Sequence, residues 1–400
     1  MTDVIATYSF RPRSDTRPEE AALAICEEET TGTLTGIPTR ADYVKRFDGE
    51  VISLTPLDNG YVARIRYPVE LFEPGNIAQY LSVVAGNLFS LSQVEAVRLM
   101  DIEYPDQLVS PFRGPKFGIS GLRRLIGTKT RPHVGTIIKP KVGLTPEDTA
   151  AVAYRAAIGG VDLVIDDETL TDQAFCPIEK RVPAVMNRLA EAKDETGQEV
   201  LYAVNISTRA DRIVERALHA IDLGANMIMV DVFTTGFGAL QALAEDQRVR
   251  VPVHVHRTMH GAFTRNPEHG IAMRPLAQII RWLGADQFYT GTVSGKMIYD
   301  EADVKAGIAA ITCNCHAMKR TLPVSSGGIH PGNVAHELEV LGTDIVIQAG
   351  SGIHNHPDGT TAGTRAMRQA VDAFIEGKTA EEYAKDHYEL ERALERWGSS

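Results

Sequence analysis

The sequence predicts an α/β enzyme in which an eight-stranded (β/α)8 TIM barrel follows a small α+β (ferredoxin-like) domain. From about Pro115 onward, short apolar runs recur roughly every 25 to 40 residues, and each is followed by polar or glycine-rich residues and a helix-like segment. Eight such units in series are typical of a closed parallel barrel. The first 110 or so residues lack this alternation. We therefore expect a domain at residues 1–114 and a barrel with a C-terminal helical tail at residues 115–400.

The eight predicted barrel strands are short runs rich in Val, Ile and Leu. They are Val134–Ile138, Leu163–Ile165, Leu201–Val204, Met227–Val230, Val253–Val255, Gln287–Tyr289, Leu322–Val324 and Ile345–Ile347. Helical signals lie between them. Thr145, followed by Pro146, predicts a capped helix start, and Thr208–Leu223 has apolar residues at helical spacing. Ala380–Trp397 predicts one solvated helix that packs on the barrel.

The region before the barrel has a different pattern. Val51–Leu54 and Tyr61–Tyr67 resemble strands, and Asp58-Asn59-Gly60 between them is a hairpin-turn signal. Helical segments are expected around Glu19–Cys26 and Ile77–Val84. These elements indicate a separate α+β domain.

Composition excludes several classes of function. The chain has 400 residues, 44% of them hydrophobic, and a formal charge of −11 without a Lys/Arg-rich run. A nucleic-acid or anionic-membrane surface needs clustered cations, so neither partner is expected. No secretory signal or apolar run of about 18 residues is present, which predicts a cytoplasmic enzyme. The four cysteines are expected to be reduced thiols.

The residues that follow the predicted strands are candidates for the active site, because strand exits of such barrels meet at one rim. Lys139 and Lys141 bracket a proline after the first strand, and Asp166-Asp167-Glu168 follow the second. Desolvated lysines can act as bases, and successive carboxylates can hold a hard cation such as Mg²⁺. The alternatives are surface cations and a solvated acidic turn.

The later strands end in histidines and glycine turns. His254 and His256 share one face of their strand, so at least one should point inward, as a proton shuttle or as a core histidine. Lys296 follows a Ser-Gly pair, which suits a mobile loop over the substrate as well as an ordinary exposed lysine. The glycine turns after the last two strands predict a phosphate site, with tight strand-to-helix connections as the alternative.

Taken in order, these motifs resemble the RuBisCO large-chain superfamily over nearly the whole chain. The matching segments are Gly135-Thr-Ile-Ile-Lys139-Pro-Lys141-Val-Gly-Leu144, Gly159-Gly-Val-Asp-Leu-Val-Ile-Asp-Asp-Glu168, His254-Val-His-Arg-Thr-Met-His260, Thr290-Gly-Thr-Val-Ser-Gly-Lys296, Ser326-Gly-Gly-Ile-His330, Gln348-Ala-Gly-Ser-Gly352, Glu28-Glu-Thr-Thr-Gly-Thr33, Gly86-Asn87 and Phe112-Arg-Gly-Pro-Lys-Phe-Gly118.

The resemblance implies a role for each matching residue. Lys139 is similar to the family's proton-transfer lysine, His256 to its proton-transferring barrel histidine, and Lys296 to the flexible-loop lysine. Asp167 and Glu168 match the two carboxylate ligands of Mg²⁺. The phosphate and hydroxyl binding positions are Arg257, Ser326, Gly327, Gly328, Gly350 and Ser351. The resemblance also implies a phosphorylated small-molecule substrate and a homodimer or higher assembly, whose shared sites take Glu28, Thr33 and Asn87 from the partner subunit.

One position departs from the carboxylating members. Ile165 stands where they have the lysine that captures CO₂ and becomes the third metal ligand, so no carbamate is expected and Mg²⁺ binding is open. Tyr289, Ser351 and Leu34 also differ from the family's phosphate-site residues. These departures favour a form IV RuBisCO-like protein that does not fix CO₂.

Several reactions through an enolate or enediolate agree with this interpretation. The first choice is decarboxylation of a phosphorylated keto sugar acid such as 3-oxo-isoapionate 4-phosphate. The alternatives are a transcarboxylase/hydrolase on the same substrate class, a methionine-salvage enolase or isomerase, and a barrel that binds a phosphorylated metabolite without turning it over.

Overall fold

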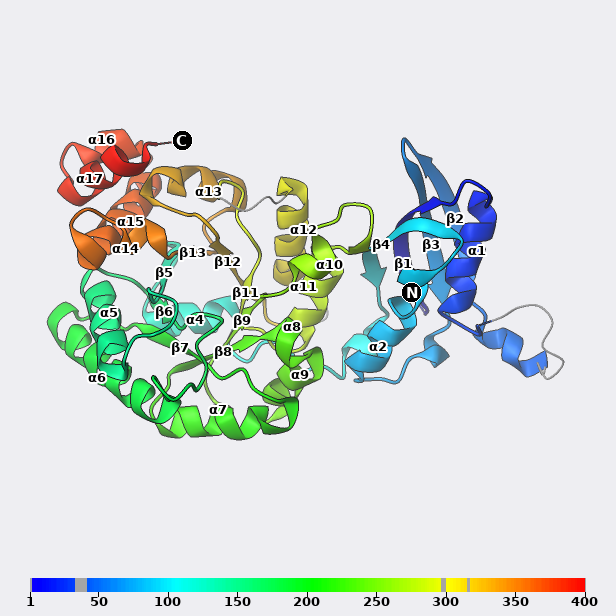
Figure 1. Cartoon of the computed structure of the whole chain (residues 1–400), viewed down its shortest axis with the longest axis horizontal. Coiled ribbons are helices and arrows are strands. Elements are labelled where there is room, and N and C mark those ends of the chain that lie inside the picture. The colour runs from blue at the N-terminus through cyan, green and yellow to red at the C-terminus, as the bar shows by residue number, and fades with distance from the viewer. Residues whose placement is uncertain (1, 33–41, 296–299, 315–316, 400) are drawn as a thin grey trace.

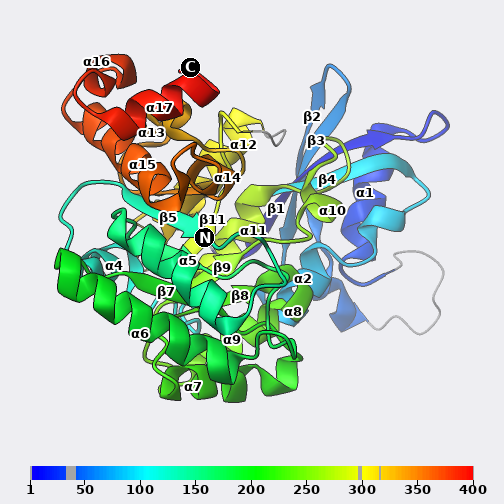
Figure 2. The ribbon, with the colours of Figure 1, turned by 60° about the vertical axis from the view of Figure 1, so that its left-hand side comes forward.

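The computed structural model describes residues 2–32, 42–295, 300–314 and 317–399. A closed parallel barrel forms the larger part, and a domain built on a mixed sheet stands beside it (Figures 1 and 2). This arrangement confirms the predicted fold class.

The barrel closes in the order β11-β12-β13-β5-β6-β7-β8-β9. Its strands are β5 (His133–Ile137), β6 (Leu163–Ile165), β7 (Leu201–Asn205), β8 (Met227–Asp231), β9 (Val253–His256), β11 (Gln287–Tyr289), β12 (Leu322–Ser326) and β13 (Val346–Ala349). All eight predicted strands are confirmed. The pairing of β13 with β5, which includes Ile347 opposite Val134, closes the barrel.

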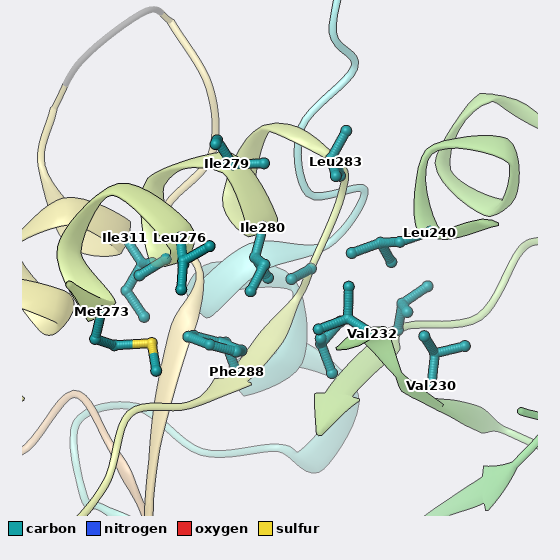
Figure 3. Packing of buried hydrophobic residues seen from close by; sticks show 14 of the residues in the cluster. Val230, Val232, Leu240, Met273, Leu276, Ile279, Ile280, Leu283, Phe288 and Ile311 are labelled. Carbon is teal, nitrogen blue, oxygen red and sulfur yellow. The ribbon is translucent and has the colours of Figure 1, made fainter. Parts of the chain in front are cut away.

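Alternating side chains of each strand face two different apolar layers. Leu163 and Ile165 of β6 belong to the cluster inside the barrel, whereas Val164 belongs to the larger cluster between the strands and the helices. Figure 3 shows part of this outer layer, where Phe288 of β11 lies near Ile280, and Val230 of β8 lies on the other side of Val232. The two layers fix each strand's orientation, so the residues after each strand are placed at the rim.

Helices surround the barrel, and further helices form the C-terminal part of the chain. They are α5 (Pro146–Ile158), α6 (Ile178–Thr196), η4 (Ala210–Arg212), α7 (Ile213–Asp222), α8 (Val232–Thr235), α9 (Phe237–Glu245), α10 (Gly261–Thr264), α11 (Met273–Trp282), α12 (Glu301–Thr312), η5 (Pro331–Asn333), α13 (Val334–Leu341), α14 (Ser351–His354), α15 (Gly359–Ile375), α16 (Ala380–Ala384) and α17 (Tyr388–Trp397). The Thr145 side chain accepts from the Asp148 amide, which confirms the predicted cap of α5.

The predicted C-terminal helix is divided into α16 and α17. The His387 imidazole Nδ1 lies 2.7 Å from the Tyr383 carbonyl, which the His387 amide would bind in a continuous helix. That amide binds the Ala384 carbonyl instead. The side chain thus competes with the backbone, and the helix ends there.

The helix α4 (Gly118–Ile126) closes the N-terminal end of the barrel. Its Ile119 and Leu122 belong to the inner apolar cluster. The buried Asp286 carboxylate fixes this helix to the strands: it accepts from the amides of Phe117 and Gly118 through one oxygen and from the Val253 amide through the other. The floor of the barrel is therefore tied to β9.

The N-terminal domain is a five-stranded sheet in the order β10-β4-β1-β3-β2. Its elements are β1 (Val4–Pro12), α1 (Pro18–Glu28), η1 (Asp42–Phe47), β2 (Glu50–Leu57), β3 (Gly60–Tyr67), η2 (Val69–Leu71), α2 (Ile77–Val84), η3 (Leu88–Ser90), β4 (Val94–Glu103) and α3 (Asp106–Val109), and β10 (Gly270–Ile271) comes from the barrel chain. The predicted hairpin and both predicted helices are present. The sequence analysis missed β1 and β4, although β1 has the period-two burial of a half-buried strand.

The structure also bears on the state of the cysteines and on membrane-spanning helices. Cys26 and Cys176 are free and buried, but Cys313 is disulfide-bonded, so the prediction of reduced thiols is wrong at that residue; Cys315 lies outside the described residues. Within the described ranges, none of the helices has the length and apolar character needed to cross a bilayer.

Candidate active site

The predicted catalytic lysines and carboxylates meet where β5 and β6 end. The Lys139 ammonium lies 2.9 Å from Oδ2 of Asp167, and Lys141 lies 2.7 Å from Oε1 of Glu168 and 3.5 Å from Oδ1 of Asp167. Burial raises the pKa of Asp167, but hydrogen bonds from Lys139 and other neighbours outweigh it and the pKa is lowered. The salt bridge to Glu168 raises the pKa of Lys141. The structure therefore joins these four residues in one charged cluster.

The third carboxylate of the acidic triplet has a structural role. Asp166 is fully buried and accepts from the Tyr202 hydroxyl at 2.6 Å, the Asn205 amide at 3.0 Å and the Arg181 guanidinium at 3.1 Å. It faces away from the lysines that bind Asp167. Ile165, just before it, is buried in the inner apolar cluster. An isoleucine side chain has no amine to carbamylate.

The two histidines of β9 lie at different depths. His254 is fully buried, its Nδ1 lies 2.8 Å from Gln287 Oε1, and burial lowers its pKa to about 3. This identifies it as the core histidine. His256 is closer to the rim, where Nδ1 accepts from the Thr258 amide at 3.1 Å and lies 3.3 Å from Asp231 Oδ1. Its proton-transfer role stays a prediction.

Tyr289 closes the space between the histidines and the acidic cluster. Its ring is perpendicular to that of His256, with centroids 4.5 Å apart, and its hydroxyl accepts from the Gln348 amide. Burial, and then the negative charge of Glu168, raise its pKa well above the usual value. The tyrosine at this phosphate-site position thus points into the barrel and is already hydrogen-bonded.

The predicted phosphate loops follow β12 and β13. Gly327 and Gly328 have φ angles of 125° and 106°, which favour glycine, and their turn begins at Ser326. Gly350 lies against the Lys139 side chain: a Cβ there would be 3.1 Å from Lys139 Cε. Ser351 begins α14 and is exposed, and Arg257 after β9 is buried. Backbone amides and a cation thus lie on the same rim as Lys139.

A residue that the sequence analysis missed holds the loop leading to Lys296. The Glu337 carboxylate on α13 is buried and accepts hydrogen bonds from the Ser294 amide and hydroxyl at 2.7 Å each, from the Val293 amide at 2.8 Å and from the Thr292 hydroxyl. Its other oxygen accepts from Ser325. Lys296 itself lies outside the described residues. Only the tertiary fold reveals this contact, because Glu337 is an ordinary helix residue in sequence.

Asp231 is a second residue that was missed. It is the last residue of β8, buried, and its Oδ2 accepts from Ser207 at 3.1 Å and Asn205 at 3.3 Å. Its Oδ1, which faces His256, has no hydrogen-bond partner in the described structure. The strand-exit rule that selected Lys139 applies equally to this aspartate.

A buried carboxylate connects the two segments that contain Glu28 and Asn87, which are predicted to face a partner subunit. Glu29, next to Glu28, accepts from the Gly86 amide at 3.0 Å and the Leu88 amide at 2.8 Å, which fixes the segment containing Asn87 against the end of α1. Burial raises the pKa of Glu29 to about 7. Thr33 and Leu34 lie outside the described residues.

The residues as placed do not fit Mg²⁺. The two predicted ligands, Asp167 and Glu168, are bound to ammonium groups, and Ile165 supplies no oxygen. The described part of the chain contains no group of three or more His, Cys, Asp or Glu side chains that is arranged to hold a metal. Mg²⁺ prefers oxygen ligands in a near-octahedral arrangement, which these pairs do not offer.

Comparison with known proteins identifies the family. The model of the ribulose bisphosphate carboxylase large chain, catalytic domain, matches residues 118–397, and that of the N-terminal domain matches residues 1–108. The chain belongs to the RuBisCO large-chain family. Curated relatives named ribulose bisphosphate carboxylase include the Pyrococcus furiosus protein, 39% identical over 99% of this chain and 94% of that protein, and the Methanosarcina acetivorans protein, 41% identical over 99% and 96%.

Solved structures agree with this assignment. The octameric Rubisco of Pyrococcus horikoshii has a TM-score of 0.94 at 38% identity, covering 99% of this chain and 94% of that one. The dimeric archaeal Rubisco of Hyperthermus butylicus has a TM-score of 0.92 at 35% identity, covering 100% and 96%. A rubisco-like protein of Alicyclobacillus acidocaldarius has a TM-score of 0.90 at 36% identity, covering 99% and 100%. The family is thus shown, whereas membership of form IV is not.

These relatives correct the predicted reaction. The first choice was a decarboxylase of keto sugar acids that does not fix CO₂, with a transcarboxylase/hydrolase, a methionine-salvage enzyme and a non-catalytic barrel as alternatives. Relatives named as carboxylases match almost the whole chain, and they overturn that prediction. Ile165 is a departure at a single position, whereas the agreement with these carboxylases extends along 99% of the chain.

Proposed function

We propose that this chain catalyses the reaction for which its curated relatives are named, on ribulose bisphosphate. The observation that carries the proposal is the position of Lys139, whose ammonium is 2.9 Å from Asp167 and whose side chain touches Gly350 of the predicted phosphate loop. A substrate phosphate held by that loop brings its carbon chain to the lysine. The reaction then begins with enolisation of the ketose.

In the proposed first step, Lys139 removes the proton from the carbon beside the substrate carbonyl, and the C–H electron pair forms the enediolate. The neighbouring carboxylate Asp167 holds the Lys139 side chain in place, and the lysine gives up its own proton to solvent before it acts as the base. His256, 3.3 Å from the Asp231 carboxylate, is placed to exchange a second proton. The enediolate carbon then adds to CO₂.

The remaining predicted residues bind the substrate. Arg257 and the amides around Gly327 and Gly350 hold the phosphates, because backbone N–H groups and a guanidinium are strong donors to anionic oxygen. Ser326, Gly328 and Ser351 complete the loops, and Lys141 and Lys296 supply further positive charge. In a homodimer or higher assembly, Glu28, Thr33 and Asn87 are supplied across the subunit interface. The octameric and dimeric states of the structural neighbours support such an assembly.

Mg²⁺ binding at Asp167 and Glu168 is a separate prediction. The metal must displace two ammonium groups and finds no carbamate at Ile165, so we expect a dissociation constant of about 1 mM or weaker. Calorimetric titration of the wild type and of Asp167→Ala checks this. Micromolar binding that Asp167→Ala abolishes would contradict the expected weakness, and equal binding by the two proteins would place the ion elsewhere.

The proposed activity is tested by incubating the protein with ribulose bisphosphate and labelled CO₂. We expect acid-stable label that depends on the bisphosphate, together with exchange of the substrate's C3 proton with solvent. Lys139→Met should remove both signals. Absence of label over a range of pH and CO₂ concentrations, with a folded protein, would sink the carboxylase proposal.

A further inference from the structure

A basic cavity lies at the end of the barrel opposite Lys139. It has a volume of about 520 Å³ and is lined by residues around the start of α4 and by the segment that precedes β12, including Lys116, Phe117, Arg124, Met318, Lys319 and Arg320. Both segments lie before their strands begin, so the cavity is at the N-terminal end of the barrel. The catalytic rim is at the C-terminal end.

Four cations line this cavity, and the described residues of its lining include no carboxylate. The Lys116 ammonium donates to the carbonyls of Asp246 at 2.6 Å, Val249 at 2.8 Å and Leu243 at 3.2 Å. The Lys319 ammonium donates to the Lys116 carbonyl. Neutral carbonyl groups fix both ammonium groups without cancelling their charge.

The two arginines keep most of their hydrogen-bonding capacity. Arg320 lies 3.6 Å from Asp344 Oδ2, and the other oxygen of Asp344 accepts from Arg123 at 2.8 Å. Arg124 is exposed and has no ion-pair partner among the residues that the structure describes. Asp344 is the carboxylate beside Arg320, while Asp246 and Asp286 act electrostatically on Lys116.

The cavity is also held rigidly. The Ile119 amide donates to the Arg320 carbonyl at 2.9 Å, and a Cβ on Gly118 would lie 2.7 Å from that same oxygen. The φ angle of Gly118 is 60°, in the region that favours glycine. The start of α4 is therefore pressed against the segment that contains Lys319 and Arg320, so the backbone that carries the cations is fixed in the structure.

We propose that this cavity binds a small phosphorylated metabolite, at a site separate from the catalytic rim. The guanidinium groups of Arg124 and Arg320 bind the phosphate oxygens, for which their planar donor pairs are suited. The fixed charges of Lys116 and Lys319 add attraction, and Phe117 and Met318 provide an apolar wall for the carbon body of the ligand. This inference does not depend on the proposed carboxylase activity.

Calorimetric titration with inorganic pyrophosphate tests the site at low and moderate salt. The wild type should show binding at two separable sites. In the double variant Arg124→Gln/Arg320→Gln, we expect one of them to weaken by roughly tenfold for each lost arginine. Arg257→Gln, at the catalytic rim, should weaken the other site and leave the cavity site unchanged.

Arg13→Gln, which removes an exposed arginine of the N-terminal domain, is the matched control and should bind like the wild type. Circular dichroism confirms that each variant is folded, and the single variant Arg124→Gln replaces the double variant if that one is not. The proposal is overturned if loss of the cavity arginines leaves all pyrophosphate binding unchanged, or if Arg257→Gln alone removes all of it.

Discussion

The two sides of the catalytic rim satisfy their polar groups in different ways. Where β5 and β6 end, Lys139 is bound to Asp167 and Lys141 to Glu168, so each of these charges has a partner. Around β8 and β9, Asp231 Oδ1 at the rim has no hydrogen bond in the described structure, and in the layer below neither do His254 Nε2 and Gln287 Nε2. The lysines and carboxylates of the first side are paired, whereas the second side keeps a carboxylate oxygen without a hydrogen bond.

This difference separates two tasks. A buried polar atom without a partner costs about 1 to 3 kcal/mol, so such atoms persist where a ligand or ordered water completes them. The ion pairs of the first side hold its ammonium groups in fixed positions, whereas the open oxygen of Asp231 can accept a hydrogen bond from a ligand. Four substitutions test this comparison, from the largest expected effect to the smallest.

Lys139→Met removes the amine from the paired side and leaves Asp167 buried without its ammonium. We expect C3 proton exchange of ribulose bisphosphate to fall by about a thousandfold, or about 4 kcal/mol of barrier. Lys141→Met, which removes a half-exposed lysine, is the control and should lose much less. Exchange within tenfold of the wild type would show that the base is elsewhere.

His254→Gln tests how much the burial of a neutral histidine lowers the stability of the protein at acid pH. Burial lowers the His254 pKa to about 3, while the unfolded residue titrates near 6.5, so the unfolded state binds the extra proton first. Stability is therefore fully present above pH 6.5 and is lost as the pH falls toward 3, by roughly 3 kcal/mol at about pH 4.5.

Urea unfolding of His254→Gln at pH 7 and pH 4.5 should show a smaller loss than the wild type over the same interval. His219→Gln, at an exposed position on α7, should keep the wild-type loss. Equal pH dependence in all three proteins would mean that His254 is not held neutral by burial.

Asp231→Asn removes the negative charge facing His256 and preserves the size of the side chain. We expect kcat to fall about thirtyfold, or about 2 kcal/mol, because the imidazole loses the carboxylate that lies beside it. Asp222→Asn at the end of α7 is the control. A kcat within threefold of the wild type would separate Asp231 from proton transfer.

Glu337→Gln should have the smallest effect, because it weakens the loop anchor without changing the rim. The glutamine amide of the variant keeps one acceptor oxygen, whereas several donors bind the two carboxylate oxygens of the wild type. We expect KM to rise about fivefold, or about 1 kcal/mol, with kcat changing less. Glu339→Gln, at an exposed position of the same helix, is the control and should leave KM unchanged. An equal rise in KM for this variant would indicate a general effect on α13.

Sequence periodicity predicted the barrel because each strand is short, apolar and followed by a distinct exit. It also selected Lys139 and Asp167, which the structure joins in one cluster. The sequence could not predict how deeply each histidine of β9 is buried. Both lie on the same face of the strand by the two-residue period, and only the packing of the layer below the rim buries His254. The anchor Glu337 depends on a loop 43 residues earlier in the chain, and no local pattern records it.

The carboxylate of Asp286 has a consequence for fragments of this chain. Its two oxygens bind the entry to α4 and the first residue of β9, so in the native state the helix at the floor and a strand from the middle of the chain share one carboxylate. A fragment that begins after Gly118 would lack both of the amides that Asp286 holds there.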